Sequence, residues 1–325
     1  MYSLKDISVI IATYNRSEDL FKTVNSFKKK IVTLEEVLII DQSTDNLARK
    51  AIKKLKSKKI RYYHSKIPSL TAARNKGIDK LSDKGKIVIF LDDDVTLDEN
   101  YFENILAVFN KYPEAKGVSG HYFPKNDKIN SFELFLRRVC LLESWTKNKA
   151  EILSPFGATY PHSLTDIICA SWIPGFNMAY KKELFNKEVF DENFSRYALA
   201  EDLEFSTRIN KKYPNSLFIT PYASIIHRVS KIERTPKPKL IYMNLINHLY
   251  IQSKNFNTFK GIVSLGFALI SLSLLNIIRG IAKPNIYNLY KTKIYLKSIL
   301  FCFGRLYFIR NGNLEIPKMP NRYTF

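Results

Sequence analysis

The sequence predicts an α/β protein with a mostly parallel central sheet flanked by helices. In the first 115 residues, short apolar runs rich in Val and Ile alternate with longer amphipathic segments, which is the pattern of βαβ units. Polar clusters directly follow three of the apolar runs. Ligands of such sheets bind at the carboxyl ends of the strands, so these clusters agree with a Rossmann-like layout.

The expected elements alternate regularly. Strands are predicted over 7–13, 36–40, 60–64 and 87–91, and helices over 18–30, 46–56, 70–81 and 97–112. The strand segments are short and rich in β-branched or aromatic residues, whereas the helix segments carry apolar residues at helical spacing. Later in the chain, a helix is expected from Glu201 to Asn210 and a strand from Tyr222 to Ile226.

Composition indicates a folded globular chain. The 325 residues are 46% hydrophobic and 25% charged, enough for one large domain and an appendage. The cysteines, Cys140, Cys169 and Cys302, are far apart, which argues against a zinc knuckle or a disulfide framework and favours a reducing compartment. We see no secretory signal pattern at the N-terminus, so we expect the main domain to stay in the cytoplasm.

The net charge of +21 is concentrated near the C-terminus. Residues 231–325 hold fifteen Lys or Arg and two Glu, a net charge of +13, and residues 1–230 carry the remaining +8. The change falls in a segment with two prolines and several cations, which indicates a linker over 231–240. We therefore expect a main domain over 1–230 and a basic, apolar helical region over 241–325.

Three consecutive aspartates, Asp92, Asp93 and Asp94, follow the predicted strand 87–91. Carboxylates this close raise one another's pKa, and a hard divalent cation removes the repulsion. The alternative is a solvated acidic turn before a helix. Two more polar clusters, residues 13–16 and 41–45, follow the first two strands and favour a nucleotide site at one edge of the sheet. The sequence contains neither a GxGxxG fingerprint after the first strand nor a P-loop.

Six motifs together resemble the family 2 glycosyltransferases of GT-A fold. They occur in order over about residues 6–230: ISVIIATYNR (7–16), DQSTD (41–45), ARNKG (73–77), LDDD (91–94), PGFNMA (174–179) and AEDL (200–203). The resemblance implies a catalytic domain over 1–230. Its nucleotide-binding half covers about 1–115, and its acceptor and catalytic-base half covers about 116–230.

The resemblance implies inverting transfer of a sugar from a nucleoside-diphosphate sugar to a hydroxyl group. Mn²⁺ or Mg²⁺ would stabilise the departing diphosphate as a Lewis acid. Asp94 is then the first choice for a metal ligand, with Asp92 and Asp93 near the metal or the ribose. His227 is a further candidate ligand, although a histidine at a strand end is equally often a packed or solvated residue.

The acceptor hydroxyl needs a general base on the opposite side of the sugar. By resemblance, Asp202 is that base, and Glu201 substitutes for it or orients it. Alternatively, the two acids only occupy the first turn of a helix, where the helix dipole favours negative charge. Gly175, Asn177 and Trp172 are expected to contact the acceptor.

Besides Asp92 and Asp93, the residues expected to bind the nucleotide are Thr13, Tyr14, Asn15, Arg16, Asp41 and Arg74. Asp41 would accept from the base, and the Arg74 guanidinium would pair with phosphate or base oxygens. Packing is the alternative for Tyr14, and an exposed helical cation is the alternative for Arg74. Relatives commonly have a glycine between the aspartate and the serine, and here Gln42 leads directly into Ser43, which predicts a shorter turn and altered contacts with the base.

Two apolar segments, 261–278 and 295–309, lie in the C-terminal region. The first is at the short limit for a membrane span, and crossing would carry many cations outward, against the positive-inside rule. Helices in the headgroup region satisfy both the charges and the apolar faces. We therefore expect peripheral or monotopic attachment to an anionic membrane surface on the cytoplasmic side. A helical subdomain that packs on the catalytic domain or on a partner is the alternative.

The expected function is sugar transfer to a glycan or lipid-linked acceptor in cell-surface polysaccharide synthesis. A nucleotidyltransferase acting on a sugar phosphate would carry a Gly-rich loop with Arg or Lys near the first strand, which we do not find. A basic protein without catalysis, bound to membrane or nucleic acid, would also explain the charge. However, the cations lie beside lipid-like segments without a nucleic-acid recognition motif, so no nucleic-acid partner is expected.

Overall fold

A computed structural model describes residues 1–122, 131–146, 149–154, 156–161, 163–194, 196–232, 235–282 and 286–317. The described residues form two compact units, one within 1–124 and 162–234 and the other within 125–161 and 235–325. The first unit ends close to the expected linker, of which residues 233–234 lie outside the described part. Residues 131–161 group with the C-terminal helices. The catalytic-domain and linker limits given above remain predictions.

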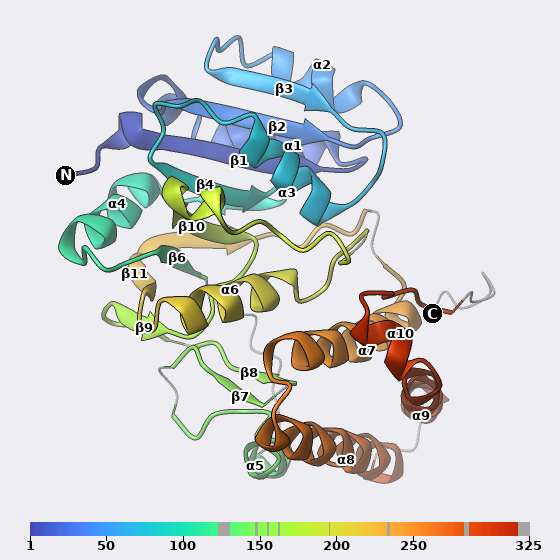
Figure 1. Ribbon diagram of the computed structural model, residues 1–325. Helices are drawn as coiled ribbons and strands as arrows, with labels where there is room; N and C mark the ends of the chain where they lie inside the picture. Colours follow the sequence, from blue (N-terminus) through green and yellow to red (C-terminus); the bar gives the residue numbers. More distant parts are fainter. Residues whose placement is uncertain are drawn as a thin grey trace. The chain divides into compact units, whose positions relative to one another are not determined.

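The first unit is built on one sheet with the strand order β3-β2-β1-β4-β10-β6-β11-β5, and β9 pairs with β11 (Figure 1). The strand bounds are β1 Ile7–Thr13, β2 Glu36–Asp41, β3 Ile60–His64, β4 Ile87–Asp92, β5 Val95–Leu97, β6 Gly117–Tyr122, β9 Ile168–Ala170, β10 Asn177–Lys181 and β11 Leu217–His227. Strands β1 to β4 pair in parallel, and β10 runs antiparallel between β4 and β6. This confirms the predicted α/β fold with a mostly parallel sheet.

Helices cover both faces of the sheet (Figure 1). They are α1 Ser17–Ser26, α2 Leu47–Lys53, α3 Leu70–Asp79, α4 Tyr101–Lys111 and α6 Glu201–Lys212. Val9 packs in the core with α1, α2 and α4, whereas Ile10 on the opposite face packs against α3. A Cβ on Gly77 would lie 2.6 Å from Ile10 Cγ2, so glycine permits this close helix–strand contact. Burial on both faces explains the nearly continuous apolar strands.

The helix predicted over 97–112 begins later than expected. Residues Val95–Leu97 form β5, and α4 begins only at Tyr101. The side chains of β5 alternate between buried and half-buried, as in a strand. This run of three residues, between the aspartates and the helical pattern, was not recognised as a strand in the sequence. Strand β5 matters for the site because it pairs antiparallel with the end of β11, with Val95 opposite His227.

The second unit contains mostly helices (Figure 1). They are α5 Ser131–Val139, α7 Lys237–Asn255, α8 Phe259–Ala282, α9 Ile286–Gly304 and α10 Leu306–Arg310, and a small hairpin joins β7 Ile152–Ser154 to β8 Gly157–Ala158. Within α8, the stretch of 23 residues from 259 to 281 is long and apolar enough to cross a membrane, with a mean hydropathy of 2.2. Of the apolar window in this stretch, 22% is buried in the structure.

Candidate active site

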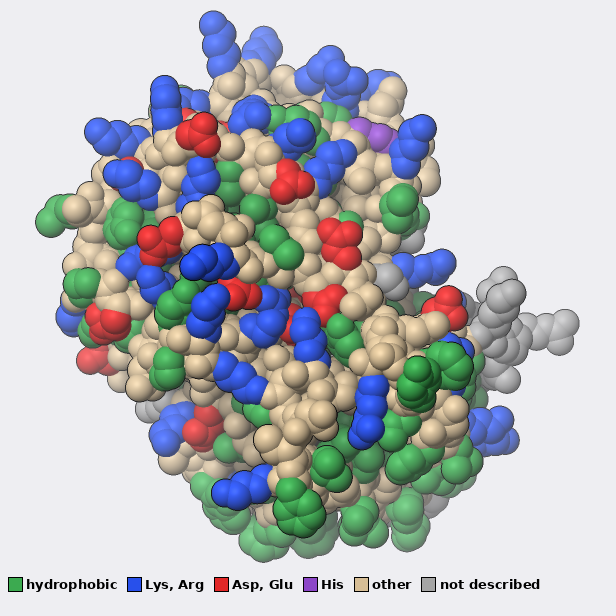
Figure 2. Space-filling view, viewed as in Figure 1, with side chains coloured by type: hydrophobic (Ala, Val, Ile, Leu, Met, Phe, Trp, Pro, Cys, Tyr) green, Lys and Arg blue, Asp and Glu red, His purple; other side chains and the backbone are tan. Residues whose placement is uncertain are grey.

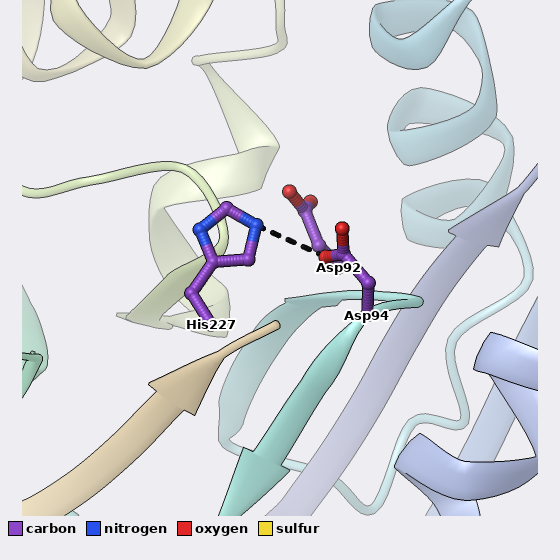
Figure 3. A group of neighbouring side chains, drawn as sticks. All are labelled: Asp92, Asp94 and His227. Carbon is purple, nitrogen blue, oxygen red and sulfur yellow. Dashed lines mark ion pairs between the residues drawn. The ribbon is translucent and has the colours of Figure 1, made fainter. Parts of the chain in front are cut away.

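Asp92, Asp94 and His227 come together at one edge of the sheet (Figure 3). Asp92 ends β4, Asp94 lies in the turn to β5, and His227 ends β11. One ligand atom from each residue lies within 4.8 Å of the other two. The pairing of β11 with β5 explains how a histidine so distant in sequence arrives beside the aspartates. The three side chains form a group that can hold a metal ion.

Asp94 is the buried member of this group, with 3% of the residue exposed. Its Oδ1 lies 3.0 Å from His227 Nε2, and its Oδ2 accepts from the Ser230 N–H at 2.7 Å. Burial acts to raise the pKa of Asp94, but His227 and Ser230 outweigh it and lower the pKa to about 2. A buried, ionised carboxylate beside an imidazole fits a divalent cation that accepts oxygen and nitrogen ligands.

Asp93 lies outside the metal-ligand group and connects the turn to the first strand. Its Oδ2 accepts from the Thr13 hydroxyl at 2.7 Å, and the Arg16 guanidinium donates to its Oδ1 at 3.2 Å. Burial raises the pKa of Asp93 to about 7, although Arg16 and Thr13 act against the increase. The expected contact of Asp93 with the ribose remains a prediction.

Two residues that the sequence did not single out hold the aspartate turn in place. Thr23 of α1 is fully buried, and its hydroxyl donates to the Asp93 carbonyl at 2.6 Å. Arg228 donates to the Val95 carbonyl at 2.5 Å and to Thr23 Oγ1 at 2.8 Å. A threonine inside a helix carries no distinguishing sequence signal. The only signal for Arg228 was its position directly after His227.

The two acids predicted for catalysis begin α6, in agreement with a favourable helix-dipole position. Asp202 Oδ2 accepts from the Gly175 N–H at 2.8 Å, and its Oδ1 accepts from the Leu203 N–H at 2.9 Å. Burial raises the pKa of both acids, and Arg74 acts against the increase at Glu201. A Cβ on residue 175 would lie 2.8 Å from Glu201 Oε1, which explains the glycine.

Arg74 of α3 connects the metal-ligand group with the acidic pair. Only 3% of the residue is exposed, so the alternative of an exposed helical cation is wrong. Its guanidinium donates to Glu201 Oε1, to the Gly175 carbonyl at 2.8 Å and to Asp92 Oδ1 at 3.4 Å. Its Cζ also lies 5.4 Å from the centre of the Phe190 ring. The predicted contact of Arg74 with the nucleotide remains a prediction.

Replacing Arg74 with methionine is expected to lower the free energy of unfolding by about 3–5 kcal/mol, because it leaves the buried Glu201 carboxylate without its cation. Urea unfolding of the Arg74→Met variant measures the loss. The double variant Arg74→Met/Glu201→Gln should recover part of it, since the uncompensated charge is then absent. Equal stabilities of Arg74→Met and the unmodified protein would contradict the structural role given to the pair.

The turn after β2 is held by side chains of its own. Asp41 is fully buried, its Oδ1 accepts from the Ser43 N–H at 2.8 Å, and the Tyr62 hydroxyl donates to its Oδ2. Gln42 donates from Nε2 to the carbonyls of Ile67 at 2.6 Å and Ser69 at 3.0 Å. Gln42 therefore attaches this turn to the segment before α3. The contact of Asp41 with a base remains a prediction.

The first two polar clusters meet, as expected. Thr13 is paired with Asp41 in the parallel sheet, and the Asn15 N–H donates to Ser43 Oγ at 2.8 Å. Asn15 has a φ of 54°, a left-handed conformation that asparagine tolerates better than most residues. Tyr14 is half-buried beside them. Binding of nucleotide by these residues remains a prediction.

Asn177 is accounted for by packing of the sheet. It is fully buried, and its amide nitrogen donates to the Gly120 carbonyl at 2.7 Å. Its Oδ1 accepts from the Gly120 N–H at 3.3 Å and from the Tyr101 hydroxyl. These contacts fix β10 beside β6, and the contact of Asn177 with an acceptor remains a prediction. Trp172 is half-buried between β9 and β10, and its contact with an acceptor remains a prediction.

A mostly parallel sheet, a metal-ligand group after β4 and an acidic pair at the start of α6 are the features of a GT-A glycosyltransferase. The profile of glycosyl transferase family 2 matches residues 8–187, more than half of the chain. The chain therefore belongs to glycosyl transferase family 2. This confirms the predicted family and the predicted class of enzyme.

Among curated relatives, an uncharacterized glycosyltransferase of Rickettsia bellii is 35% identical over 109 residues, which are 33% of this chain and 15% of the relative. Glycosyltransferase GlyA of Streptococcus pneumoniae is 24% identical over 187 residues, which are 57% of this chain and 26% of the relative. The matched segments therefore span about a quarter or less of these relatives.

Solved structures show the same fold. GalNAc-T7 with UDP, GalNAc and Mn²⁺ matches with a TM-score of 0.52 at 17% identity, over 76% of this chain and 48% of that one. A mannosyltransferase of Pyrobaculum calidifontis in complex with GDP-Man and Mn²⁺ matches with a TM-score of 0.52 at 15% identity, over 95% and 84% of the two chains. At these identities the similarity shows the fold, which is the predicted GT-A fold.

Proposed function

We propose that the chain transfers a sugar from a nucleoside-diphosphate sugar to an acceptor hydroxyl, with metal assistance and inversion at the anomeric carbon. The observation that carries the proposal is the direct connection of the metal-ligand group to the acidic pair, because Arg74 contacts both Asp92 and Glu201. Two structures of the same fold are described with a nucleotide or nucleotide sugar and Mn²⁺, which supports this choice of donor.

Asp92, Asp94 and His227 are the residues that would hold the ion. A bound divalent cation supplies positive charge against which the diphosphate of the donor leaves. Two carboxylates suit a hard ion, and the imidazole favours Mn²⁺ over Mg²⁺, which prefers oxygen ligands. The ionised Asp94 keeps its negative charge at neutral pH because its pKa is lowered to about 2.

Asp202 is proposed to take the proton of the acceptor hydroxyl. The N–H groups of Gly175 and Leu203 fix the orientation of its carboxylate. Burial raises the pKa of Asp202 from its ordinary value towards the range in which a general base works best near neutral pH. Glu201 has the separate task of holding Arg74. Gly175 is proposed to line the approach of the acceptor, since its backbone contacts Asp202.

The acceptor is proposed to be a glycan or a lipid-linked glycan of the cell surface, and the C-terminal unit is proposed to attach the protein to the cytoplasmic side of the membrane. The long apolar helix α8 supports attachment, and so does the net charge of +13 over residues 231–325. Anionic headgroups attract such cations near the surface.

A donor panel tests the proposed chemistry. The purified 325-residue chain with Mn²⁺ is given UDP-, GDP- and dTDP-linked sugars, and release of the nucleoside diphosphate is measured. We expect release from one nucleotide class, which disappears when the metal is chelated. Release that is unaffected by chelation would contradict the metal-assisted mechanism, and formation of a new nucleotide sugar from a sugar phosphate would indicate a nucleotidyltransferase.

A further inference from the structure

An open apolar groove of about 690 Å³ lies between the helices α8 and α9 of the second unit. Its walls come from Ile277 and Ile281 on α8 and from Leu289, Leu296 and Leu300 on α9. This volume is in the range of pockets that hold small organic ligands. The groove is separate from the residues that form the candidate active site and has no part in the proposed transfer chemistry.

Gly280 lines the floor of the groove and allows α8 and α9 to approach each other closely. A Cβ on Gly280 would lie 3.3 Å from Thr292 Oγ1. The Thr292 hydroxyl donates to the Asn276 carbonyl at 3.0 Å, which holds the two helices together at this level. The groove therefore lies beside a defined contact between the two helices.

Two lysines line the groove together with the apolar side chains. Lys293 and Lys297 are exposed and stand one turn apart on α9. Within the described residues neither forms an ion pair, and the sequence from 259 to 304 contains no Asp or Glu. Like charges at this spacing repel. An anion placed between the two lysines would remove this repulsion.

The walls expose apolar surface that water solvates poorly. Ile281 is 75% exposed and Leu300 is 73% exposed. Figure 2 shows hydrophobic side chains gathered over the helices of this unit, with single cations among them. Contiguous exposed apolar surface of this kind marks an interaction site. A matching ligand has an apolar chain for the walls and a negatively charged head for the lysines.

We propose that this groove binds one anionic membrane phospholipid, with an acyl chain along Ile281 and Leu300 and the phosphate between Lys293 and Lys297. The proposal deepens the membrane attachment proposed above and rests on it. It adds a specific lipid site to what would otherwise be diffuse attraction between a basic region and an anionic surface. The charge complementarity favours a lipid over a second copy of this basic chain.

The test uses the full chain and vesicles of phosphatidylcholine and phosphatidylglycerol, with a trace of phosphatidylglycerol that carries a photoreactive acyl chain. Cross-linked peptides are identified by mass spectrometry. We expect labelling on the groove walls of α8 and α9. Lys293→Gln/Lys297→Gln should reduce this labelling on the order of 20-fold, at about fivefold for each lysine near an anionic surface. The matched control, Lys254→Gln/Lys260→Gln, changes the net charge equally outside the groove and should reduce labelling less than about threefold.

A second variant tests the shape of the groove with its charges intact. Gly280→Leu fills the floor with a side chain of good helix propensity. We expect it to lose the groove labelling while the protein still floats with the vesicles, and circular dichroism checks that its helices are retained. Equal losses for the two lysine pairs, or labelling confined to other segments, would overturn the lipid site while membrane attachment stands. Failure of the unmodified chain to float with any vesicle would overturn both.

Discussion

Asp202→Asn is expected to lower kcat for sugar transfer by about 10²–10⁴-fold, the usual contribution of a positioned general base. The donor KM should change little, because the carboxylate contacts the backbone of Gly175 and Leu203 and not the metal-ligand group. Asparagine keeps the shape and one acceptor oxygen, so it retains one of the two hydrogen bonds from the backbone N–H groups of Gly175 and Leu203. Steady-state kinetics with the donor identified in the panel, together with thermal unfolding of the same sample, separates the loss of rate from a loss of stability.

The neighbouring acid gives a matched comparison. Glu201→Gln removes the carboxylate one residue away, while its remaining carbonyl oxygen can still accept from Arg74. Since Glu201 positions Arg74 and is not the base, we expect a fall in kcat of less than about tenfold, well below the general-base effect. A larger loss for Glu201→Gln than for Asp202→Asn would reverse the two roles.

Sequence alone indicated two members of the group that can hold a metal ion, because Asp92 and Asp94 lie at or just beyond the end of a predicted strand. Asp92 and Asp94 directly follow a clear apolar run, and parallel neighbours bring the ends of β1, β2 and β4 to one edge. His227 was correctly placed at a strand end. Its position beside Asp94, however, depends on β5, whose three residues are too few to leave a recognisable pattern.

The contacts between functional side chains were beyond sequence reasoning because they join elements through the third dimension. A helical arginine is usually solvated, and nothing local indicates that Arg74 is buried against Glu201 and Gly175. Gln42 was recognised as unusual, but its attachment to Ile67 and Ser69 depends on where that segment lies. Asn177 matched a motif and is nevertheless used by the sheet itself.

The contacts of Arg74 connect the group that can hold a metal ion with the acidic pair. Its guanidinium contacts Asp92, which belongs to the metal-ligand group, as well as Glu201, which lies beside the proposed base. A cation on Asp92 competes with Arg74 for the same carboxylate, because both are positively charged. With Asp92 as a proposed ligand, we expect metal binding to act on the arginine that Glu201 holds, so that the metal affinity depends on both halves of the site.

Asp94→Asn is expected to weaken Mn²⁺ binding by at least about 100-fold. Even residues that only hydrogen-bond to a metal ligand change metal affinity by roughly 10–100-fold. Sugar transfer should fall with it, since the remaining ligands, Asp92 and His227, hold an ion less firmly. Titration of free Mn²⁺ by electron paramagnetic resonance measures the affinity without any donor. Asp93→Asn is the matched control, because Asp93 is equally buried but pairs with Thr13 and Arg16 outside the ligand group. We expect its Mn²⁺ affinity to stay within about tenfold, and equal losses for the two variants would remove the distinction between ligand and support.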